Sequence, residues 1–528
     1  MFYFLWHGDK ASLTSERYWD LDEISREHPE VFNDRNNPYW GSPPGRYYFW
    51  GKPIYGYYHG DDYWVHLKNI QLLTDAGVDL LIIDATNRLT YPSQSEALMK
   101  AMDNVRAQGK NPPKIVYYTN SASGETMQEI YNYYYREGAP HRHPECWFYL
   151  YGKPLIIGVT SEIGNGDYKD FFTFRESQWP TVSKVANGWP WISFKRKPEV
   201  HFNDRGEKEI LNVSTAQHPN PSIGMGGSAF YGNKENWGRS FRNNSPGNSE
   251  IDLPYGYNFQ EQWDYALQEN TPFIFVTGWN EWIAGRWTDP HENPNVSFFC
   301  DQASPEYSRD IEPTLTGDLK DHYYMQLINN IRKYKGIEKE QPAGVMQSIK
   351  KMDDWAKVSS VHVDYVNDTQ NRNHPGAQSV PEIIYTNTTG RNDFHTLKIA
   401  RDKQNIYFYA ETVDQITPIS GDNWMRLYID TDRNPKTGWY GYDYRVIEGS
   451  KLQLFADDIW VDANKNIHFN IENNQLSITI PRKSLKNLSD SIDLEFKWSD
   501  NMQAEDPLDW YINGDTAPGG RFNCIYKE

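Results

Sequence analysis

Short apolar runs alternate with longer amphipathic stretches through residues 1–335, and this alternation restricts the fold more than any other feature. Apolar residues three and four positions apart predict helices over residues 63–76, 96–108, 125–136, 259–269 and 318–334. Strands that alternate with helices are typical of the α/β class and predict a (β/α)8, TIM-like barrel. The expected strands are residues 2–6, 80–84, 114–119, 155–159, 191–194, 212–216, 273–277 and 297–300.

Two long stretches rich in Gly, Pro and Asn, residues 167–188 and 219–254, interrupt this alternation. Loops of this length in a compact domain are usually functional. We expect them to wall a cleft at the C-terminal ends of the strands.

The sequence pattern changes near residues 335–344, where helical periodicity ends and Pro342-Ala343-Gly344 forms a linker. Short segments with period-two alternation follow, separated by turn residues, and they predict an antiparallel β-sandwich. We therefore expect a catalytic barrel at residues 1–340 and a sandwich domain at residues 345–528. The alternating segments are residues 396–400, 406–411, 424–430, 442–447, 452–455, 467–471, 476–480 and 493–498.

Composition narrows the class of partner. The chain has 528 residues and a net charge of −18, which argues against nucleic acid because phosphate binding needs basic patches. Its longest apolar runs, residues 80–83 and 273–276, are too short for a transmembrane segment. With 20 Trp and 37 Tyr, the chain has many aromatic faces that could stack on sugar rings, although large cores also use them. We expect a polysaccharide or glycan as the partner.

The three cysteines, Cys146, Cys300 and Cys524, show neither metal-ligand spacing nor a dense disulfide framework. Met1 leads directly into the expected strand at residues 2–6, so we do not expect these residues to be an export signal. A glycan-directed protein is expected to be secreted, periplasmic or on the cell surface, although a cytoplasmic protein would begin in the same way.

The expected strand at residues 273–277 runs into TGWNEW at residues 277–282, which places Glu281 at the C-terminal mouth of a barrel. Desolvation by neighbouring indoles would favour a protonated carboxyl, which suits a general acid or base. Asn280 could bind a sugar hydroxyl or orient Glu281, and Trp279 and Trp282 could form platforms. The alternative is a structural glutamate paired with an arginine such as Arg286.

Glycoside hydrolysis generally uses two carboxyl groups that flank the scissile bond. Asp84 ends the strand at residues 80–84 and could bind substrate or brace the barrel. Asp301 follows the last expected strand, and Asp310 and Glu312 lie just beyond it, where Arg309 makes a local ion pair an alternative. The candidate catalytic residues are Glu281, Glu312 and Asp84.

Polar residues near the first strand and the first long helix are further candidates, although Asp61 or Asp62 could equally be the N-cap of that helix. The residues expected to contact substrate are His7, His59, Asp61, Asp62, Trp279, Asn280, Trp282 and Arg286. The 14 His residues include no HExxH-type pair, and His141 and His143 lie in a loop without an obvious third ligand. A metal-dependent esterase is therefore disfavoured, and no cofactor is expected for catalysis.

Residues 54–87, WNEW at residues 279–282 and IEP at residues 311–313 resemble the barrels of glycoside hydrolase families 71 and 99 over residues 1–335. Family 99 cleaves α-mannosidic linkages, and the resemblance implies two glutamates three residues apart. The first, which deprotonates the substrate's 2-hydroxyl, matches Glu281, but the second falls at Ala284. Either another carboxylate (Glu312, Asp84 or Asp301) replaces it, or the linkage and mechanism differ, or the domain binds glycan without cleaving it.

The C-terminal region, at residues 424–439 and 441–444, resembles family 9 carbohydrate-binding modules. Asp430, Asp432 and Asn434 alternate along a turn and could bind a structural Ca²⁺, or they could form Asx turns in a hairpin. Trp424, Trp439 and Trp460 could stack on sugar or pack in the core. The sequence therefore predicts a glycoside hydrolase centred on Glu281, with a non-catalytic glycan-binding protein as the alternative.

Overall fold

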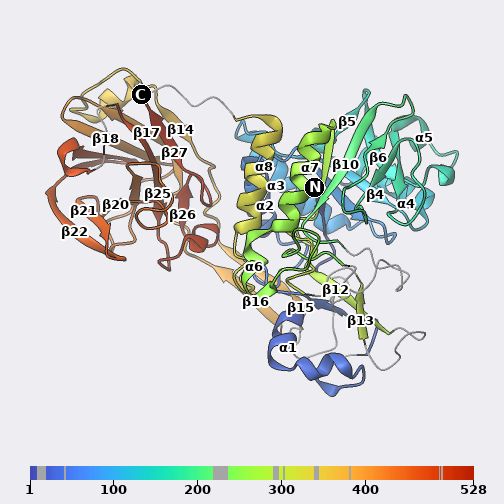
Figure 1. Ribbon diagram of the computed structural model, residues 1–528. Helices are drawn as coiled ribbons and strands as arrows, with labels where there is room; N and C mark the ends of the chain where they lie inside the picture. The colour runs from blue at the N-terminus through green and yellow to red at the C-terminus, as the bar shows by residue number, and fades with distance from the viewer. Residues whose placement is uncertain are drawn as a thin grey trace. The chain divides into compact units, whose positions relative to one another are not determined.

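The computed structural model describes residues 1–8, 20–40, 43–217, 236–288, 297–300, 304–337, 344–379, 382–486, 488 and 491–528. These residues form two units, each considered by itself (Figure 1). The N-terminal unit contains Met1–Gly336 and His374–Tyr385. The C-terminal unit contains Ile337–Asn373 and Thr386–Glu528.

A curled sheet of parallel strands lies at the centre of the N-terminal unit, in the order β1-β3-β4-β6-β7-β8. Strand β3 is buried along its whole length and pairs with β4 from Leu80↔Lys114 to Ala85↔Thr119. A short strand, β5 (Tyr149–Leu150), adds antiparallel to β6. The parallel strands are β1 (Phe2–Tyr3), β3 (Leu80–Ala85), β4 (Lys114–Thr119), β6 (Lys153–Gly158), β7 (Thr173–Gln178) and β8 (Gly188–Pro190).

A second sheet, β11-β10-β9, continues the parallel arrangement. It consists of β9 (His201–Phe202), β10 (Lys208–Ser214) and β11 (Phe273–Thr277), and β10 and β11 are parallel. Hydrogen bonds link it to both edges of the first sheet. Among them, Trp279 N donates to Phe2 O at 2.8 Å, and Asn212 Nδ2 donates to Pro190 O at 2.7 Å. The observed architecture is thus a half-barrel of parallel strands with a neighbouring parallel pair.

All five helices predicted for this unit are present: α2 (Tyr63–Asp75), α3 (Pro92–Ala107), α4 (Ser123–Ile130), α7 (Tyr257–Glu269) and α8 (His322–Lys335). The helix α4 continues into a π-helical turn, Tyr131–Tyr135. Shorter helices are α1 (Leu21–Glu27), α5 (Tyr168–Phe171) and α6 (Ser249–Asp252). Among the described residues, no helix has the length and apolar character needed to cross a bilayer.

Two of the predicted strands differ from the structure. Residues 191–194 follow the end of β8 and form no strand. Residues 297–300 form β13 (Ser297–Cys300), which is antiparallel to β12 (Ile283–Thr288), and β12 also pairs with β2 (Tyr47–Phe49). The missing parallel strand is β7, which lies inside the predicted loop at residues 167–188.

The polar sequence of β7 explains why periodicity did not reveal it. Its Arg175 is buried and donates two hydrogen bonds to Glu209, at 2.8 Å and 2.6 Å. Trp189 Nε1 donates to the same carboxylate at 2.9 Å. A buried ion pair of this kind has no hydrophobic signature in the sequence.

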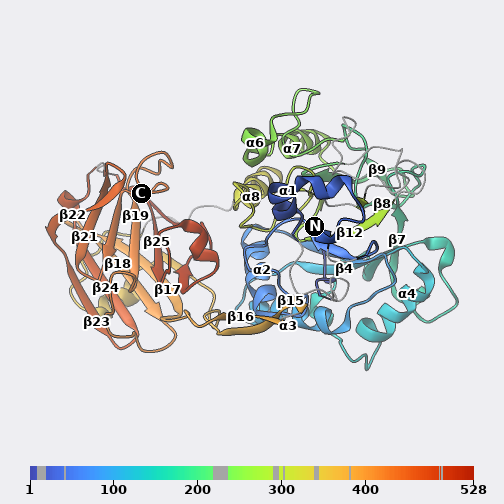
Figure 2. The same ribbon diagram turned by 90° about the horizontal axis from the view of Figure 1, so that it is seen from below.

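The C-terminal unit contains two antiparallel sheets that share one apolar core (Figure 2). Phe408 and Phe496 meet across this core with ring centroids 5.4 Å apart. Each of the eight predicted segments overlaps a strand. One sheet contains β14 (Val361–Val363), β17 (Phe394–Arg401), β18 (Asn405–Thr412), β24 (Gln475–Pro481) and β23 (His468–Glu472). The other contains β22 (Ile459–Asn466), β21 (Lys451–Ala456), β20 (Tyr444–Ile447), β19 (Arg426–Asp430), β25 (Asp493–Asp500), β26 (Asp515–Ala517) and β27 (Cys524–Lys527).

A hairpin from the second half of the chain, β15 (Arg372–Ser379) and β16 (Glu382–Asn387), contributes its central part to the N-terminal unit. Ala377 N donates to Tyr57 O at 2.7 Å, and Tyr57 N donates to Tyr385 Oη at 2.8 Å. The sequence predicted a single boundary near residues 335–344, and therefore assigned residues 374–385 to the second domain.

Candidate active site

A cavity of about 350 Å³ lies at the carboxyl ends of the parallel strands. Asp84 of β3 and Glu281, which follows β11, both line it. Four indoles share the wall: Trp6, Trp179, Trp191 and Trp287. Parallel α/β folds carry their active sites at this end of the strands, and ligand cavities combine apolar walls with a few polar groups. Two of the three predicted catalytic residues therefore lie in one cavity.

Glu281 forms an ion pair with Arg309, whose Nη2 lies 2.9 Å from Glu281 Oε2. The side chains are 7% and 2% exposed, so little water screens the pair. The guanidinium also lies over the ring of Trp191, 4.9 Å from its centroid. An adjacent cation favours the ionised carboxylate. Arg286, the partner considered from the sequence, lies instead over Trp40 at 4.7 Å and is completely buried.

The peptide groups on both sides of Glu281 are fixed from behind. Glu281 N donates to Asp310 Oδ1 at 2.5 Å, and Trp50 Nε1 donates to Glu281 O at 3.0 Å. Trp50 also stacks on Trp282, with centroids 4.5 Å apart and planes at 19°. Burial raises the pKa of Asp310 to about 6. These contacts orient the Glu281 backbone and leave its carboxylate at the cavity.

Asn280 and His7 join the ends of β1 and β11. Phe4 N donates to Asn280 Oδ1 at 2.9 Å, and Asn280 Nδ2 donates to Phe4 O at 3.1 Å. His7 Nε2 lies 2.8 Å from Asn280 O, and burial lowers the pKa of His7 to about 3, so the ring is neutral and donates to this carbonyl. Both residues were predicted as substrate contacts, and the structure places both in the core.

Glu312 lies in a closed polar network that does not line the cavity. Its carboxylate accepts hydrogen bonds from Tyr58 Oη at 2.8 Å, from Asn69 Nδ2 at 3.0 Å and from Trp282 Nε1. Burial raises the pKa of Glu312 to about 7, against the effect of these donors. Trp279 and Trp282 are completely buried, so the structure gives these predicted platforms no exposed face.

Asp84 occupies the end of β3 with 6% of its surface exposed. Its Oδ1 accepts hydrogen bonds from Thr86 N at 3.0 Å and from Thr86 Oγ1 at 2.7 Å. These donors are neutral, unlike the guanidinium at Glu281. Asp301, the other carboxylate considered at a strand end, lies outside the described residues.

His59, Asp61 and Asp62 surround the start of α2. His59 Nδ1 lies 2.5 Å from Asp61 Oδ1, and His374 Nε2 of the β15–β16 hairpin lies 3.4 Å from the same oxygen. Asp62 accepts a hydrogen bond from Trp64 N at 3.1 Å and is the N-cap of the helix. These three predicted substrate contacts do not line the cavity of Glu281.

Ala284, where the family resemblance would place a second glutamate, faces away from the cavity. It is completely buried in an apolar cluster with Trp40, Tyr48 and Phe299. The next residue, Gly285, lines the cavity. A carboxylate at position 284 would therefore be buried in an apolar core, and Asp84 is the second carboxylate that the cavity offers.

Sequence reasoning missed the partner of Glu281 and most of the cavity wall. The sequence suggested an ion pair between Arg309 and the acidic residues next to it in the chain. An ion pair between residues 28 positions apart leaves no local pattern in the sequence. Trp179 and Trp191 each follow a parallel strand directly. An aromatic residue directly after a strand could have indicated these two wall residues. For Trp179 this indication was missed, because β7 was not predicted as a strand.

In the C-terminal unit, Asp430, Asp432 and Asp443 have carboxylate oxygens within 4.8 Å of one another. Asp430 Oδ1 accepts from Asp432 N at 3.1 Å, and Asp432 Oδ1 accepts from Asn434 N at 3.0 Å. These are the Asx turns that the sequence left as the alternative. Asp443 lies within reach of Asp430 and Asp432, so it is a further oxygen ligand for a cation at this turn.

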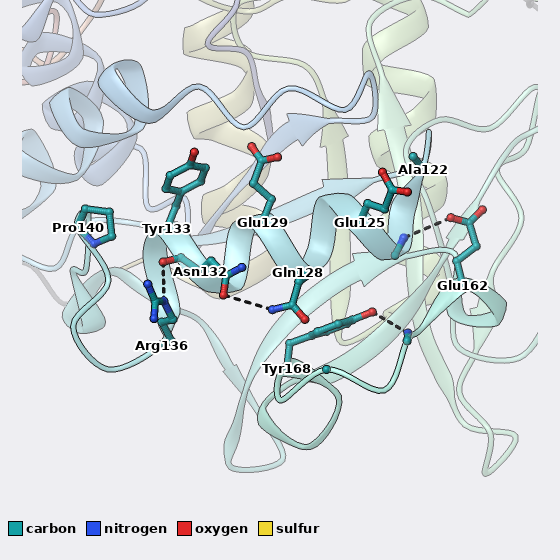
Figure 3. A pocket seen from close by; sticks show the side chains of 13 residues that line it. Ala122, Glu125, Gln128, Glu129, Asn132, Tyr133, Arg136, Pro140, Glu162 and Tyr168 are labelled. Atoms are coloured by element: carbon teal, nitrogen blue, oxygen red, sulfur yellow. Dashed lines mark hydrogen bonds between the residues drawn. The ribbon is translucent and has the colours of Figure 1, made fainter.

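A second hollow, of about 1000 Å³, lies along α4 (Figure 3). Glu125, Glu129 and Glu162 line it, and Tyr168 Oη accepts from Gly164 N at 2.7 Å at its rim. None of the predicted site residues lines this hollow. It is open and lined by three glutamates, in contrast to the indole-lined cavity of Glu281.

No family model matches the chain, and no curated protein matches it. Solved structures that match include a GH99 endo-α-mannosidase from Bacteroides thetaiotaomicron in complex with bis-tris-propane, at 14% identity over 57% of this chain and 95% of that chain, with a TM-score of 0.33. A second structure described as a GH99 endo-α-mannosidase from this organism matches at 14% identity over 54% and 84% of the chains, with a TM-score of 0.32. TM-scores of this size do not establish a common fold.

Proposed function

We propose that the protein is a glycoside hydrolase that cleaves glycosidic bonds in a polysaccharide or complex glycan. The observation that carries this proposal is the cavity in which Glu281 and Asp84 stand together among four indoles. Glycoside hydrolysis needs two carboxyl groups at the scissile bond, and indole faces stack on sugar rings. In this proposal, the parallel strands of the two sheets form one (β/α)8 barrel, and the hydrogen bonds of Trp279 and Asn212 join the two sheets.

The surroundings of the two carboxyl groups suggest different roles for them. Arg309 stabilises the negative charge of Glu281, which suits a nucleophile or a general base. Asp84 is the other carboxyl group that lines the cavity, and we assign to it proton donation to the leaving oxygen.

The test is hydrolysis of a panel of α- and β-linked oligosaccharides and polysaccharides by the wild type, Glu281→Gln and Asp84→Asn. We expect cleavage of at least one linkage type by the wild type and a loss on the order of 10²-fold or more in each variant. Correct folding of both variants is checked by thermal unfolding. Cleavage that persists in Glu281→Gln would overturn the assignment of the site.

The alternative is a glycan-binding protein with a non-catalytic barrel, and the buried Ala284 favours it. Glycan-array binding by the wild type without release of reducing ends would support this alternative. Under either function we place the protein outside the cytoplasm, which fractionation of the source cells can test.

We also propose that the C-terminal unit binds a structural Ca²⁺ at Asp430, Asp432 and Asp443, and that catalysis needs no cofactor. Three carboxylates in reach of one another are the oxygen donors that Ca²⁺ prefers. Calcium should raise the unfolding temperature of the wild type and not that of Asp432→Asn. Hydrolysis should survive treatment with a chelator.

A further inference from the structure

The hollow along α4, of about 1000 Å³, is larger than the indole-lined cavity of about 350 Å³. Among the described residues, the two have no lining residue in common. Figure 3 shows the helix running along the hollow, with Tyr133 and Pro140 at one end and Glu162 at the other. The hollow therefore has room for an extended ligand that is not held by the cavity alone.

One side of this helix is polar and faces the hollow. Its lining residues follow one another at intervals of three and four positions, which places them on one face. They are Glu125, Gln128, Glu129, Asn132, Tyr133 and Arg136. The other side is apolar, and Met127 and Ile130 are completely buried there. A π-helical turn, Tyr131–Tyr135, interrupts the helix beside the hollow, and such turns are frequent at functional sites.

The opposite wall comes from the segment after β6 and approaches the helix at two glycines. Gly124 N donates to Glu162 Oε2 at 3.2 Å, and a Cβ at Gly124 would lie 2.1 Å from Glu162 O. A Cβ at Gly166 would lie 2.0 Å from Gln128 Oε1. A side chain at either position would push the two walls apart, so the floor of the hollow depends on glycine at both.

The segment after β3 joins the hollow to the indole-lined cavity. Asn87 of this segment lines the cavity. Arg88, the next residue, donates to Glu125 Oε2 of the hollow. Two residues further on, Thr90 Oγ1 donates to Glu129 Oε1 at 2.7 Å. The wall of the cavity and the rim of the hollow are thus parts of one segment.

The polar lining mixes hydrogen-bond donors with acceptors. Gln128 Nε2 donates to Asn132 Oδ1 at 3.3 Å, and each of these amides has further donor and acceptor positions. Arg136 Nε donates to Asn132 O at 3.2 Å, and its guanidinium carries four more N–H donors. Glu129 supplies carboxylate acceptors to the same wall. A sugar hydroxyl both donates and accepts, so a polyhydroxylated ligand matches this mixture.

We propose that the hollow is a second glycan-binding site, in which Tyr133 stacks on a sugar ring and Gln128 and Asn132 bind its hydroxyl groups. Tyr133 is 37% exposed, so part of its ring is open to a ligand, and aromatic rings with a polar end suit such contacts. The choice of a glycan as the ligand rests on the proposed function. A basic peptide is disfavoured, because Glu125 already pairs with Arg88 and Arg136 adds a cation to the wall.

The experiment is affinity electrophoresis of the full chain in gels that contain soluble neutral glucans or mannans, α- or β-linked. The Glu281→Gln background is used so that the polymer is not consumed. We expect Tyr133→Ala and Asn132→Ala each to weaken polysaccharide binding about fivefold, the usual loss for one stacking face or one hydrogen bond. With Glu281 intact, hydrolysis of a short oligosaccharide should be unchanged in both variants, because neither residue lines the cavity.

The matched control is Tyr149→Ala, since Tyr149 is 49% exposed and does not line the hollow. Thermal unfolding checks that all variants are folded. The proposal fails if no polysaccharide retards the protein, or if Tyr133→Ala and Asn132→Ala bind as Tyr149→Ala does. It also fails if polylysine binds in place of polysaccharide and this binding is lost in Glu129→Gln.

Failure of the proposed function would look different. A protein that hydrolyses no glycan, but whose polysaccharide binding still falls in Tyr133→Ala and not in Tyr149→Ala, would keep the second site and lose the assigned activity. Hydrolysis that depends on Glu281, with polysaccharide binding unchanged in Tyr133→Ala, would keep the activity and remove the second site.

Discussion

Glu281 and Glu312 have the same side chain, were both predicted as catalytic and are 5% and 2% exposed, yet their surroundings differ. Glu281 lines a cavity and contacts the cation of Arg309. Glu312 accepts hydrogen bonds from neutral groups, among them Tyr58 and Asn69, and lines no part of that cavity. Burial alone therefore does not separate a reactive carboxylate from a structural one. The two kinds of carboxylate are distinguished by the charge of the partner residue and by access to a cavity.

The surroundings of the two glutamates also favour opposite protonation states. A guanidinium favours the anion, and under the proposed function Glu281 would act as a base or nucleophile. For Glu312, burial outweighs its three donors and raises its pKa to about 7, so the network accepts a proton under mildly acidic conditions. The first arrangement suits chemistry, and the second suits packing of the core.

The largest expected effect is the difference in activity between matched variants of the two residues. Glu281→Gln should lose hydrolysis on the order of 10²-fold or more, because the cavity loses the carboxylate that contacts Arg309. Glu312→Gln should keep most of its activity, because it does not reach the substrate. Initial rates on the best substrate of the panel measure both. Equal losses in the two variants would remove the distinction drawn between them.

The next effect concerns stability. Arg309→Met leaves Glu281 buried without this cation, and breaking a buried pair from one side costs about 3–5 kcal/mol. Urea unfolding should show this loss at pH 7. The double variant Arg309→Met/Glu281→Gln should recover a large part of it, because the uncompensated charge is gone. A double variant as unstable as the single one would show that packing on Trp191 carries the effect.

The sequence predicted the elements whose burial is apolar. The helices α2, α3 and α7 and the strands β4 and β11 appear close to their predicted bounds, because hydrophobic periodicity follows apolar burial. It failed at β7, where Arg175 is buried against Glu209. It also could not tell that β13 pairs antiparallel with β12, since pairing partners depend on the tertiary fold.

For the candidate site, strand-end position correctly placed Glu281 and Asp84 at one cavity. The same reasoning could not show that Trp279 and Trp282 point into the core, because adjacent residues beyond a strand have no fixed period. Arg309 and Glu312 are three residues apart, but one reaches the cavity and the other the core. Side-chain direction in irregular segments is set by contacts distant in sequence.

A smaller effect is the pH dependence of stability at Glu312. Its pKa rises from 4.5 to about 7 on folding, so between these values the folded state binds more protons than the unfolded state. Stability from this group is full below pH 4.5 and falls by about 3 kcal/mol as the pH rises to 7. In Glu312→Gln this contribution should disappear.

The measurement is the free energy of unfolding in urea at pH 4.5 to 8 for the wild type and Glu312→Gln. The glutamine oxygen can accept from Trp282 and Tyr58. Its amide can face Asn69, whose buried Oδ1 has no hydrogen-bond partner in the described part of the chain and can accept after an amide flip. Parallel pH profiles for the two proteins would contradict the raised pKa of Glu312.

The smallest expected effect comes from the cavity wall. Trp287 lines the cavity of Glu281 and is 38% exposed, so Trp287→Ala should change stability little. Loss of one stacking face should weaken glycan binding by about 1 kcal/mol, or roughly fivefold, as a higher KM at nearly constant kcat. Tyr255→Ala is the control, since Tyr255 is 61% exposed and does not line this cavity. An equal change in KM for both variants would mean that exposed aromatics act non-specifically and that the indole wall does not hold the glycan.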